Sequence, residues 1–484
     1  MNIIVIYDDT GKKSEVIADI IGERGFADVV VKKRKLEDYY AESIRNIYPQ
    51  LIWKKVHSPY EYAQIEKELQ NYAEDDTRVI HCFSNYIFSD FEKASLSFRK
   101  IEYIKTPYKA LSGKKIAAAM FPDLDSYHTF CKSITGGAKA WDIARELGDS
   151  FAIEGLTDVS IVGNFIQCVA GNFESRYFNS LKGDDYTLVK TSSDKRKIKA
   201  EYTFYQLLPD DMKFWFVAPF HYQETENSAS YTMERLHMTD LSVKWVHGFM
   251  DEEEFEQLLD KYFFFFNSRH SKACTEEEYA SIADDLYANK IRKRVEMLKK
   301  LPEYRKIERM LEMTEGADID TLVEKYFALK ARIETRVKYP HVSVIGHGDP
   351  CFSNTIYNKS TQTLKFIDPK GALTEEELWT NPYYDIAKLS HSVCGRYDFL
   401  NNELFEIYVD KNLNYKLEIP FEQSRYVAIF RRKVEEHGYD YLSVRIYEAS
   451  LFLSMLPLHI DSPYKVVGFI LNAKNILEEI EKDV

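Results

Sequence analysis

The segment that most constrains the fold lies in the second half of the chain, where a polar loop separates two apolar runs. Val342–Ile345 is apolar and rich in β-branched residues, the loop HGDPCFSN follows at 347–354, and Thr355–Tyr357 starts the next run. A third run begins at Leu364 and ends in Asp368. Short apolar runs bounded by Gly, Pro and Asn are typical of strands. The segment therefore predicts a strand, a tight loop and a hairpin with an aspartate at its end.

The polar residues of this segment point to one kind of chemistry. His347, Asp349 and Asn354 fit the pattern H-x-D-x-x-x-x-N, and Asp368 lies fourteen residues after the asparagine. Phosphoryl transfer from ATP needs one carboxylate that orients the attacking hydroxyl, and an amide oxygen and a second carboxylate that hold Mg²⁺. A lone match to the pattern also occurs by chance in loops of no consequence, but the flanking strands and the strand-borne aspartate favour the functional interpretation.

A lysine and a glutamate earlier in the chain support this interpretation. Lys190 lies in the predicted strand Tyr186–Thr191, and Glu201 follows eleven residues later in the predicted helix Lys195–Leu208. A strand lysine paired with a helix glutamate is the way in which kinases hold the α- and β-phosphates of ATP. Taken alone, the two would be ordinary surface residues. Their placement upstream of the polar loop favours the ion pair.

Two backbone segments complete the expected nucleotide site. Ala170–Ser175, with its single glycine Gly171, connects two predicted strands and could cover phosphates with its amides, although a plain hairpin turn would have the same sequence. Tyr231–Arg235 has the position of a hinge between a strand and the helical part of the chain. We expect its last three residues, Met233, Glu234 and Arg235, to lie at the adenine. The backbone of Glu234 and Arg235 would form hydrogen bonds with the base.

The first 140 residues show strands in alternation with helices. A charged segment with helical periodicity around Tyr60–Tyr72 lies among four apolar runs that read as strands: Asn2–Tyr7, Asp28–Val31, Arg78–Phe83 and Lys115–Phe121. This alternation predicts an α/β domain with a mostly parallel sheet. We place its end near residue 140, after the double glycine Gly136–Gly137.

The rest of the chain predicts a β-rich lobe followed by a helical lobe, an α+β arrangement. Residues 150–235 contain four strand-like runs, namely Val159–Val169, Ser175–Leu181, Tyr186–Thr191 and Phe214–Pro219. Residues 236–484 are predominantly helical, with charged pairs at i,i+4 spacing, a brief return of strands around His341–Ile367, and helices from Tyr384 onward.

Composition and charge argue against several classes of protein. Sixty-four basic against seventy-seven acidic side chains give a net charge of −13, which argues against nucleic acid or an anionic membrane as the main partner. No run of eighteen apolar residues occurs, so we expect no membrane insertion. The N-terminus lacks the layout of a signal peptide, and the six cysteines are scattered without a C-x-x-C pair. We therefore expect a cytoplasmic protein.

Three motifs together resemble the aminoglycoside phosphotransferase and choline kinase family, a branch of the protein-kinase-like fold. They are HGDPCFSN, FIDPKG at 366–371 and YYDIAKL at 383–389, and the resemblance covers residue 153 to the C-terminus. It implies a two-lobed fold and a kinase that uses ATP and Mg²⁺. The H-G-D form, with glycine in place of the arginine of protein kinases, resembles the small-molecule branch of the fold.

The resemblance implies a role for each residue of the loop and the hairpin. Asp349 would be the catalytic base, and His347 would support the loop. Asn354 and Asp368 would be the magnesium ligands.

The same resemblance implies that Lys190 contacts the ATP phosphates with Glu201 as its partner. Asp385 resembles the family's buried aspartate that steadies the catalytic loop, with a helix N-cap as the rival role. One departure is that Asp368 is followed by Pro-Lys-Gly, so a mobile switch of the protein-kinase type is not expected. Lys370 could meet an anionic substrate or a phosphate, or could be a surface lysine.

A looser resemblance concerns the N-terminal domain. The run at 78–90, RVIHCFSNYIFSD, and the overall layout resemble chains of bacterial surface-polysaccharide gene clusters that join a nucleotidyltransferase-like domain to such a kinase. Active sugar nucleotidyltransferases have a glycine-rich basic loop after the first strand, where this chain has only Asp8–Lys13. We therefore expect residues 1–140 to be a Rossmann-like or degenerate nucleotidyltransferase-like domain.

The function expected from these features is transfer of the γ-phosphoryl group of ATP to a hydroxyl of an amino alcohol, sugar or polyol, in capsule precursor biosynthesis. The alternatives are a bifunctional nucleotidyltransferase–kinase and a nucleotide-binding pseudokinase scaffold. Neither the rings of Tyr384, Tyr397 and Phe399 nor the carboxylates of Glu375–Glu377 identify the acceptor, because a chain with so many aromatic and acidic residues offers such groups everywhere. The oligomeric state stays open.

Overall fold

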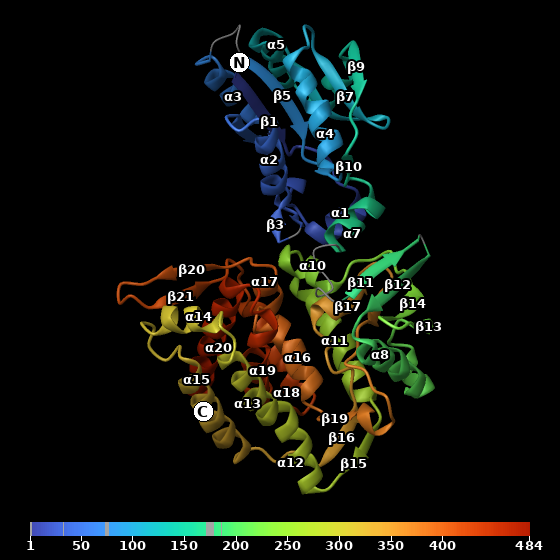
Figure 1. Ribbon diagram of the computed structural model, residues 1–484, viewed down its shortest axis with the longest axis vertical. Coiled ribbons are helices and arrows are strands. Elements are labelled where there is room, and N and C mark those ends of the chain that lie inside the picture. The colour runs from blue at the N-terminus through green and yellow to red at the C-terminus, as the bar shows by residue number, and fades with distance from the viewer. Residues whose placement is uncertain (1, 32, 73–76, 171–178, 185) are drawn as a thin grey trace. The chain divides into compact units, whose positions relative to one another are not determined.

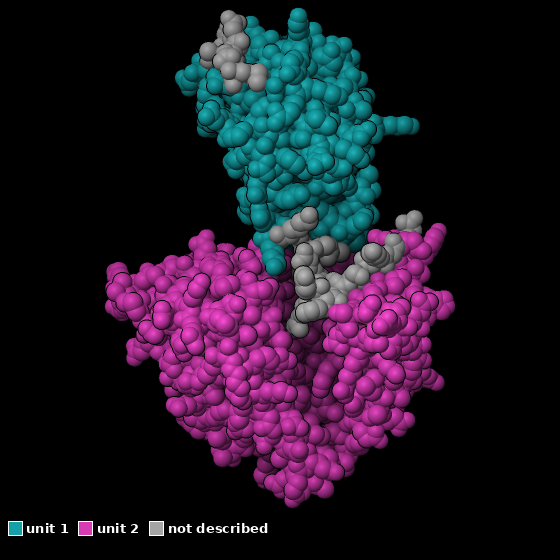
Figure 2. Space-filling model, viewed as in Figure 1, with its two compact units in different colours: residues 1–173, 247–249 teal, residues 174–246, 250–484 magenta. Residues whose placement is uncertain are grey.

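The structure is a computed structural model that describes the whole chain except residues 1, 32, 73–76, 171–178 and 185. The chain forms two compact units, which Figure 2 colours separately: residues 1–173 with 247–249, and residues 174–246 with 250–484. The first unit therefore continues past the boundary that we expected at residue 140. Residues 150–173, which we had assigned to the β-rich lobe, belong to it as well.

A six-stranded sheet forms the centre of the first unit, in the order β4-β1-β5-β8-β7-β9 (Figure 1). Its strands are β1 Asn2–Asp8, β4 Ile52–Val56, β5 Thr77–Phe83, β7 Tyr108–Ser112, β8 Lys115–Phe121 and β9 Asp149–Ala152. β1 is parallel to β4 and β5, and β7 is parallel to β9, whereas β8 is antiparallel to both of its neighbours. The sheet is thus mixed, because only two residues link β7 to β8 and such a short connection forces a hairpin.

Helices and short hairpins surround this sheet. The helices are α1 Glu15–Ile21, α2 Leu36–Ile47, α3 Tyr62–Leu69, α4 Phe91–Phe98, α5 Leu124–Thr135, α6 Ala140–Glu146 and α7 Val162–Ala170. β1, β5 and β8 are buried along nearly their whole length, which explains why they read as unbroken apolar runs in the sequence. The predicted strand Asp28–Val31 is only the two-residue β2, Val30–Val31, which pairs with β3, Arg34–Lys35, outside the main sheet.

The segment Val159–Val169, expected to be a strand, is largely the helix α7. Its apolar residues Val162, Phe165, Ile166 and Val169 recur at helical spacing, and this periodicity decides the structure. β10, Leu156–Asp158, pairs with β6, Tyr86–Phe88, and β9 extends the sheet at the edge of β7. These pairings are what place residues 149–170 in the first unit.

The second unit begins with a four-stranded antiparallel sheet in the order β11-β12-β14-β13. Its elements are β11 Asn179–Gly183, β12 Thr187–Ser192, α8 Lys195–Leu207, α9 Asp210–Lys213, β13 Pro219–Glu224 and β14 Ala229–Glu234. The predicted strand Phe214–Pro219 is mostly a connection: Phe216 forms a single bridge with Phe366, and β13 starts only at Pro219. Ile198 of α8 packs on Ala229, Tyr231 and Met233 of β14.

The remainder of the second unit is mainly helical. Its helices are α10 Leu241–Val246, α11 Glu252–Ser268, α12 Glu276–Asp284, α13 Lys290–Lys299, α14 Tyr304–Leu311, α15 Ile319–Glu334, α16 Tyr384–Val393, α17 Tyr397–Asn401, α18 Ser424–Glu436, α19 Tyr441–Met455 and α20 Pro463–Asp483. A π-helical turn, Asp285–Asn289, joins α12 to α13. α19 is buried almost all round, which is the pattern of a helix at the centre of a core.

Short strands interrupt these helices. They are β15 Ser271–Ala273, β16 Val342–Ile345, β17 Thr355–Asn358, β18 Thr363–Phe366, β19 Trp379–Thr380, β20 Glu406–Val409 and β21 Tyr415–Glu418. The hairpin β20–β21, whose strands are joined by residues 410–414, lies where we expected only helices. Among the described residues, none of the helices combines the length and the apolar character that a bilayer crossing requires.

Candidate functional site

The loop between β16 and β17 is fixed by the imidazole of His347. Its Nδ1 accepts the N–H of Asp349 at 3.0 Å, so its Nε2 is the protonated nitrogen and donates to the Ile367 carbonyl at 2.9 Å. The ring is fully buried and stacks on Phe216 at 5.7 Å between centroids. Burial lowers the pKa of His347, which keeps the ring neutral. The histidine thus ties the loop to the end of β18 and contributes no free proton.

Asp385 holds the backbone of the same loop. Its carboxylate accepts the N–H of His347 at 3.0 Å and that of Gly348 at 2.8 Å, and it forms an ion pair with Arg269 at 3.1 Å. The carboxylate is fully buried, and α16 begins one residue before Asp385, so it does not cap the helix. Gly348 has φ +82, and a Cβ there would meet the Cβ of Lys370 at 2.5 Å, so this turn requires glycine.

The loop presents the carboxylate of Asp349 at its tip. The side chain is 38% exposed, and its Oδ1 lies 2.9 Å from the Nζ of Lys388 on α16. Burial disfavours the charged carboxylate, but the Lys388 ammonium outweighs this effect and lowers the pKa of Asp349 to about 2. Asp349 is therefore an anion at neutral pH that can accept a hydrogen bond from a hydroxyl group.

Asn354 links the backbone of Asp349 to the residue that precedes Asp368. Asn354 donates from Nδ2 to the Asp349 carbonyl at 2.9 Å, and its own carbonyl accepts the N–H of Ile367 at 3.0 Å. These two bonds bring the end of the loop next to the end of β18, where Asp368 follows. Asp368 has φ +54, a left-handed conformation that is uncommon for a residue other than glycine and tends to occur at functional sites.

Ion pairs join Asp368 to the four-stranded sheet of the second unit and to α8. The Nζ of Lys190, on β12, lies 2.8 Å from Asp368 Oδ1 and 2.7 Å from Glu201 Oε2, on α8. Lys190 and Glu201 are buried, whereas the Asp368 side chain is 38% exposed. Burial disfavours the ammonium, but Asp368 and Glu201 together raise the pKa of Lys190. Two consecutive elements, β12 and α8, thus meet the distant end of β18 at one lysine.

The segment after Asp368 packs against α8. Ala372 donates its N–H to the Ala200 carbonyl at 3.0 Å, and Gly371 approaches so closely that a Cβ would lie 2.8 Å from the Ala200 backbone. The helix that carries Glu201 is therefore fixed relative to the end of β18. The side chain of Lys370 is exposed, whereas the backbone N–H of this residue donates to the His347 carbonyl at 2.9 Å.

The expected nucleotide-binding backbone is placed only in part. Met233 lines a small cavity of about 20 Å³ together with Glu201, Tyr231 and Asp368. Glu234 is exposed at the end of β14. For Arg235 the expectation needs a correction, because its N–H already donates to the Tyr186 carbonyl at 2.9 Å and its guanidinium to the Asp184 carbonyl at 2.7 Å. Gly171 lies outside the described residues.

The donor set near Asp349 fits a magnesium ion. Mg²⁺ prefers oxygen ligands and is held in phosphate-binding sites by one or two protein oxygens together with phosphates and water. The carboxylate of Asp368 is part-exposed, and the Nδ2 bond of Asn354 leaves its amide oxygen for another partner. Within the described ranges, no group of three or more His, Cys, Asp and Glu side chains is placed to hold a metal ion. The residues thus suit a metal shared with phosphates.

Lys388 is the residue of this site that the sequence analysis missed. Asp385, Lys388 and Ser392 are spaced i, i+3, i+7 on α16 and face the loop together. The first accepts from the backbone of His347 and Gly348, the second pairs with Asp349, and the Oγ of Ser392 accepts the N–H of Phe352 at 3.1 Å. The polar stripe D-x-x-K-x-x-x-S within a buried helix was the available sequence signal.

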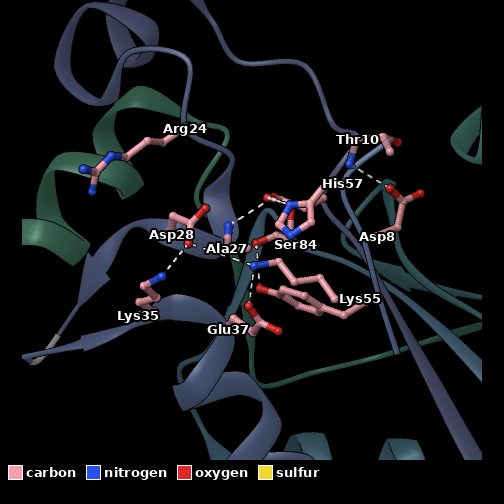
Figure 3. A network of polar contacts seen from close by, with 12 residues as sticks. Asp8, Thr10, Arg24, Ala27, Asp28, Lys35, Glu37, Lys55, His57 and Ser84 are labelled. Atoms are coloured by element: carbon pink, nitrogen blue, oxygen red, sulfur yellow. Dashed lines mark hydrogen bonds and ion pairs between the residues drawn. The ribbon is translucent and has the colours of Figure 1, made fainter. Parts of the chain in front are cut away.

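A second polar cluster lies in the first unit, at the carboxyl ends of β4, β1 and β5 (Figure 3). Asp8 accepts hydrogen bonds from the Tyr62 hydroxyl at 2.8 Å and from the Thr10 N–H at 2.8 Å, and lies 3.2 Å from His81 Nε2. Asp9 accepts the Ala27 N–H at 3.0 Å. Both carboxylates are almost fully buried, with side-chain exposures of 1% and 2%.

Two lysines of this edge are also engaged within the unit. Lys55 forms an ion pair with Glu37, and the Lys13 ammonium donates to the carbonyls of Gly22 and Arg24. The two carboxylates and these two lysines thus bind other groups of the same unit. The cluster therefore stabilises the fold and offers little to a ligand.

Comparisons with known proteins give limited information. No protein-family model matches the sequence, and no curated protein matches it. Among solved structures, the aminoglycoside phosphotransferase APH(4)-Ia is similar at 12% identity and a TM-score of 0.37, over 63% of this chain and 93% of that one. A thermostable mutant of it, in ternary complex with ADP and hygromycin B, is similar at 12% identity and a TM-score of 0.36, over 66% and 98% of the two chains.

At 12% identity and TM-scores of 0.36 and 0.37, these similarities support no conclusion about the activity of the chain. Any functional interpretation therefore has to rest on the geometry of the site.

Proposed function

We propose that the chain is an ATP- and Mg²⁺-dependent kinase of a small molecule, with its site at Asp349, Asn354, Asp368, Lys190 and Glu201. The observation that supports this most is the juxtaposition of two part-exposed carboxylates, Asp349 and Asp368, with a buried lysine that is held by a helix glutamate. Phosphoryl transfer requires this combination, because its catalysis consists mainly of positioning and charge stabilisation.

In this proposal each residue has one task. Asp349 accepts a hydrogen bond from the acceptor hydroxyl and aims its oxygen at the γ-phosphorus. The new bond forms between that oxygen and the phosphorus, the bond to the β–γ bridging oxygen breaks, and ADP leaves with the electron pair. The hydroxyl proton leaves through Asp349 to solvent. Lys190, held by Glu201, neutralises phosphate oxygens.

Asn354 and Asp368 are the residues that would hold Mg²⁺, and the metal would supply charge neutralisation to the phosphates during the transfer. His347 and Asp385 act on the backbone and keep Asp349 in place. The left-handed conformation of Asp368, at the end of a strand, fits a functional role for its side chain.

The other functions considered for the sequence have less support. A pseudokinase scaffold would not need Asp349, Asn354, Asp368 and Lys190 all in place. A nucleotidyltransferase would need available groups at the edge of the first sheet, where Asp8 and Asp9 are buried and bonded. A role in capsule precursor biosynthesis rests on the sequence resemblance alone.

The test is a screen of the full-length protein with ATP and Mg²⁺ against amino alcohols, sugars and polyols, with the phosphate ester detected by mass. We expect an ester with at least one acceptor. EDTA should abolish its formation, and added Mg²⁺ should restore it. Absence of phosphoryl transfer to every acceptor tested, or phosphoryl transfer that continues in EDTA, would contradict the proposal.

A further inference from the structure

The surroundings of Asp349 on the side of α16 carry positive charge. Tyr384, Lys388 and His391 are spaced i, i+4, i+7 and share one face of this helix. Lys388 is 16% exposed and pairs with Asp349. The hydroxyl of Tyr384 accepts a hydrogen bond from the Nζ of Lys290 at 2.9 Å, so a second ammonium group reaches the same face from α13.

The position of Lys290 depends on the π-helical turn Asp285–Asn289 directly before it. Such turns are rare and frequently occur at functional sites. This one is held firmly: the ring of Tyr287 stacks on Tyr447 at 3.9 Å between centroids, and the Tyr287 carbonyl accepts the Tyr326 hydroxyl at 2.8 Å. The shift in helix register therefore gives Lys290 a defined direction toward Tyr384.

The ammonium groups on this face outnumber the carboxylates that pair with them. Among the residues that the structure describes, no carboxylate lies within ion-pair distance of Lys290, whose contacts are the hydroxyl and the ring of Tyr384. Burial and the Lys388 ammonium hold the pKa of His391 well below its ordinary value, so this ring is neutral. Two ammonium groups thus face one carboxylate, Asp349.

One buried polar atom on this face lacks a partner. His391 is 3% exposed, and its Nε2 makes no hydrogen bond with any described residue. A buried nitrogen without a partner is unfavourable, and a bound ligand can offset that cost. It lies on the same helix face as Lys388, whose ammonium affects its pKa.

We propose that the acceptor carries an anionic group, a carboxylate or a phosphate, close to the hydroxyl that is phosphorylated, and that Lys290 and Tyr384 bind this group while Asp349 and Lys388 face the hydroxyl. This inference rests on the proposed kinase function and names its substrate class. A polycationic acceptor such as an aminoglycoside would meet two ammonium groups here instead of carboxylates.

The experiment compares acceptors that differ only in charge. Glycerate and glycerol phosphate are measured against glycerol, and gluconate and glucose phosphate against glucose, with ethanolamine and choline as cationic probes. The carboxylate and phosphate members distinguish the two kinds of anion. We expect kcat/KM for an anionic member to exceed that of its neutral parent by about tenfold or more, as for charge-assisted hydrogen bonds.

The variant Lys290→Gln tests the residue directly. It should raise KM for the anionic acceptor about tenfold and lower its preference over the neutral parent, whereas Lys290→Arg should retain most of that preference. Lys293→Gln, an exposed lysine on the same helix, is the matched control and should behave as the wild type. Circular dichroism and thermal unfolding show whether each variant is folded.

The outcomes separate this inference from the function on which it rests. Phosphorylation of neutral or cationic acceptors in preference to anionic ones, or an anionic preference that Lys290→Gln leaves unchanged, would overturn the inference and leave the kinase function standing. A folded wild-type protein that phosphorylates no acceptor of any charge would overturn both.

Discussion

Carboxylates follow the ends of buried strands in both units of this protein, but their surroundings differ. At the end of β1, Asp8 and Asp9 are 1% and 2% exposed and bind hydroxyl and amide groups of their own unit. After β16 and β18, Asp349 and Asp368 are 38% exposed, and each pairs with a lysine. Position at a strand end therefore does not by itself indicate that a carboxylate is functional. The exposed fraction of the side chain and the type of its partner distinguish the two pairs of carboxylates.

The largest effect expected from this comparison is on catalysis, at Asp349. Asp349→Asn keeps the size of the side chain and removes the charge that orients the hydroxyl, so the rate of phosphoryl transfer should fall by about three orders of magnitude or more. The unfolding temperature and the affinity for ATP should stay near those of the wild type. Steady-state kinetics and calorimetry measure these quantities, and a rate within tenfold of the wild type would remove Asp349 from the mechanism.

At Asp8 the expected effect is on stability. Asp8→Asn weakens the hydrogen bonds from Tyr62 and Thr10 inside the first unit and should lower the free energy of unfolding by about 1–3 kcal/mol. Phosphoryl transfer by the folded protein should not change. Urea unfolding and the transfer rate, measured on the same preparation, give the two results. A loss of transfer without a loss of stability would mean that this edge takes part in the reaction.

The pH dependence of Asp8 sharpens this prediction. Burial opposes its charge, but the hydrogen bond and the charge of His81 outweigh burial, and the folded-state pKa lies below the ordinary value. A carboxylate with a lowered pKa stabilises the fold above its unfolded pKa and loses this contribution as the pH falls through the folded value. The difference in stability between the wild type and Asp8→Asn should therefore shrink in acid.

The smallest effect is expected at Lys388, which acts on Asp349 and not on the fold. Burial would raise the pKa of Asp349, and Lys388 is the first of the groups that lower it to about 2. In Lys388→Met the pKa of Asp349 should rise, so kcat/KM should begin to fall at a higher pH on the acid side. Lys388→Arg should keep the wild-type profile. Identical acid limbs in all three proteins would show that Lys388 does not control the charge of Asp349.

Much of the site was predictable because the features that position it are local. The spacing of His347, Asp349 and Asn354 within one loop, and Asp368 at the end of the next hairpin, follow from short-range patterns, and the structure brings these residues together. The pair of Lys190 and Glu201 also links consecutive elements. Whether these residues perform the expected chemistry stays a prediction.

Features that depend on contacts between distant segments could not be predicted. Lys388 reads as an ordinary helix residue until α16 packs against the loop, and Lys290 reaches Tyr384 only through the π-helical turn before it. The mixed sheet of the first unit depends on the antiparallel pairing of β8 with β5, which lies well before it in the chain. The first unit extends past the expected boundary near residue 140 because β9, which lies beyond that residue, pairs with β7 in the sheet.

The most direct test of the central claim follows the phosphorus atoms of ATP. The full-length protein is incubated with Mg²⁺, an acceptor and ATP that carries a radioactive label at either the γ- or the α-phosphorus. We expect that the γ-label enters the acceptor, that the α-label does not, and that Asp349→Asn transfers neither. Entry of the α-label into the product would show nucleotidyl transfer, and γ-label transfer by Asp349→Asn at the wild-type rate would place the reaction elsewhere. Either result would contradict the account.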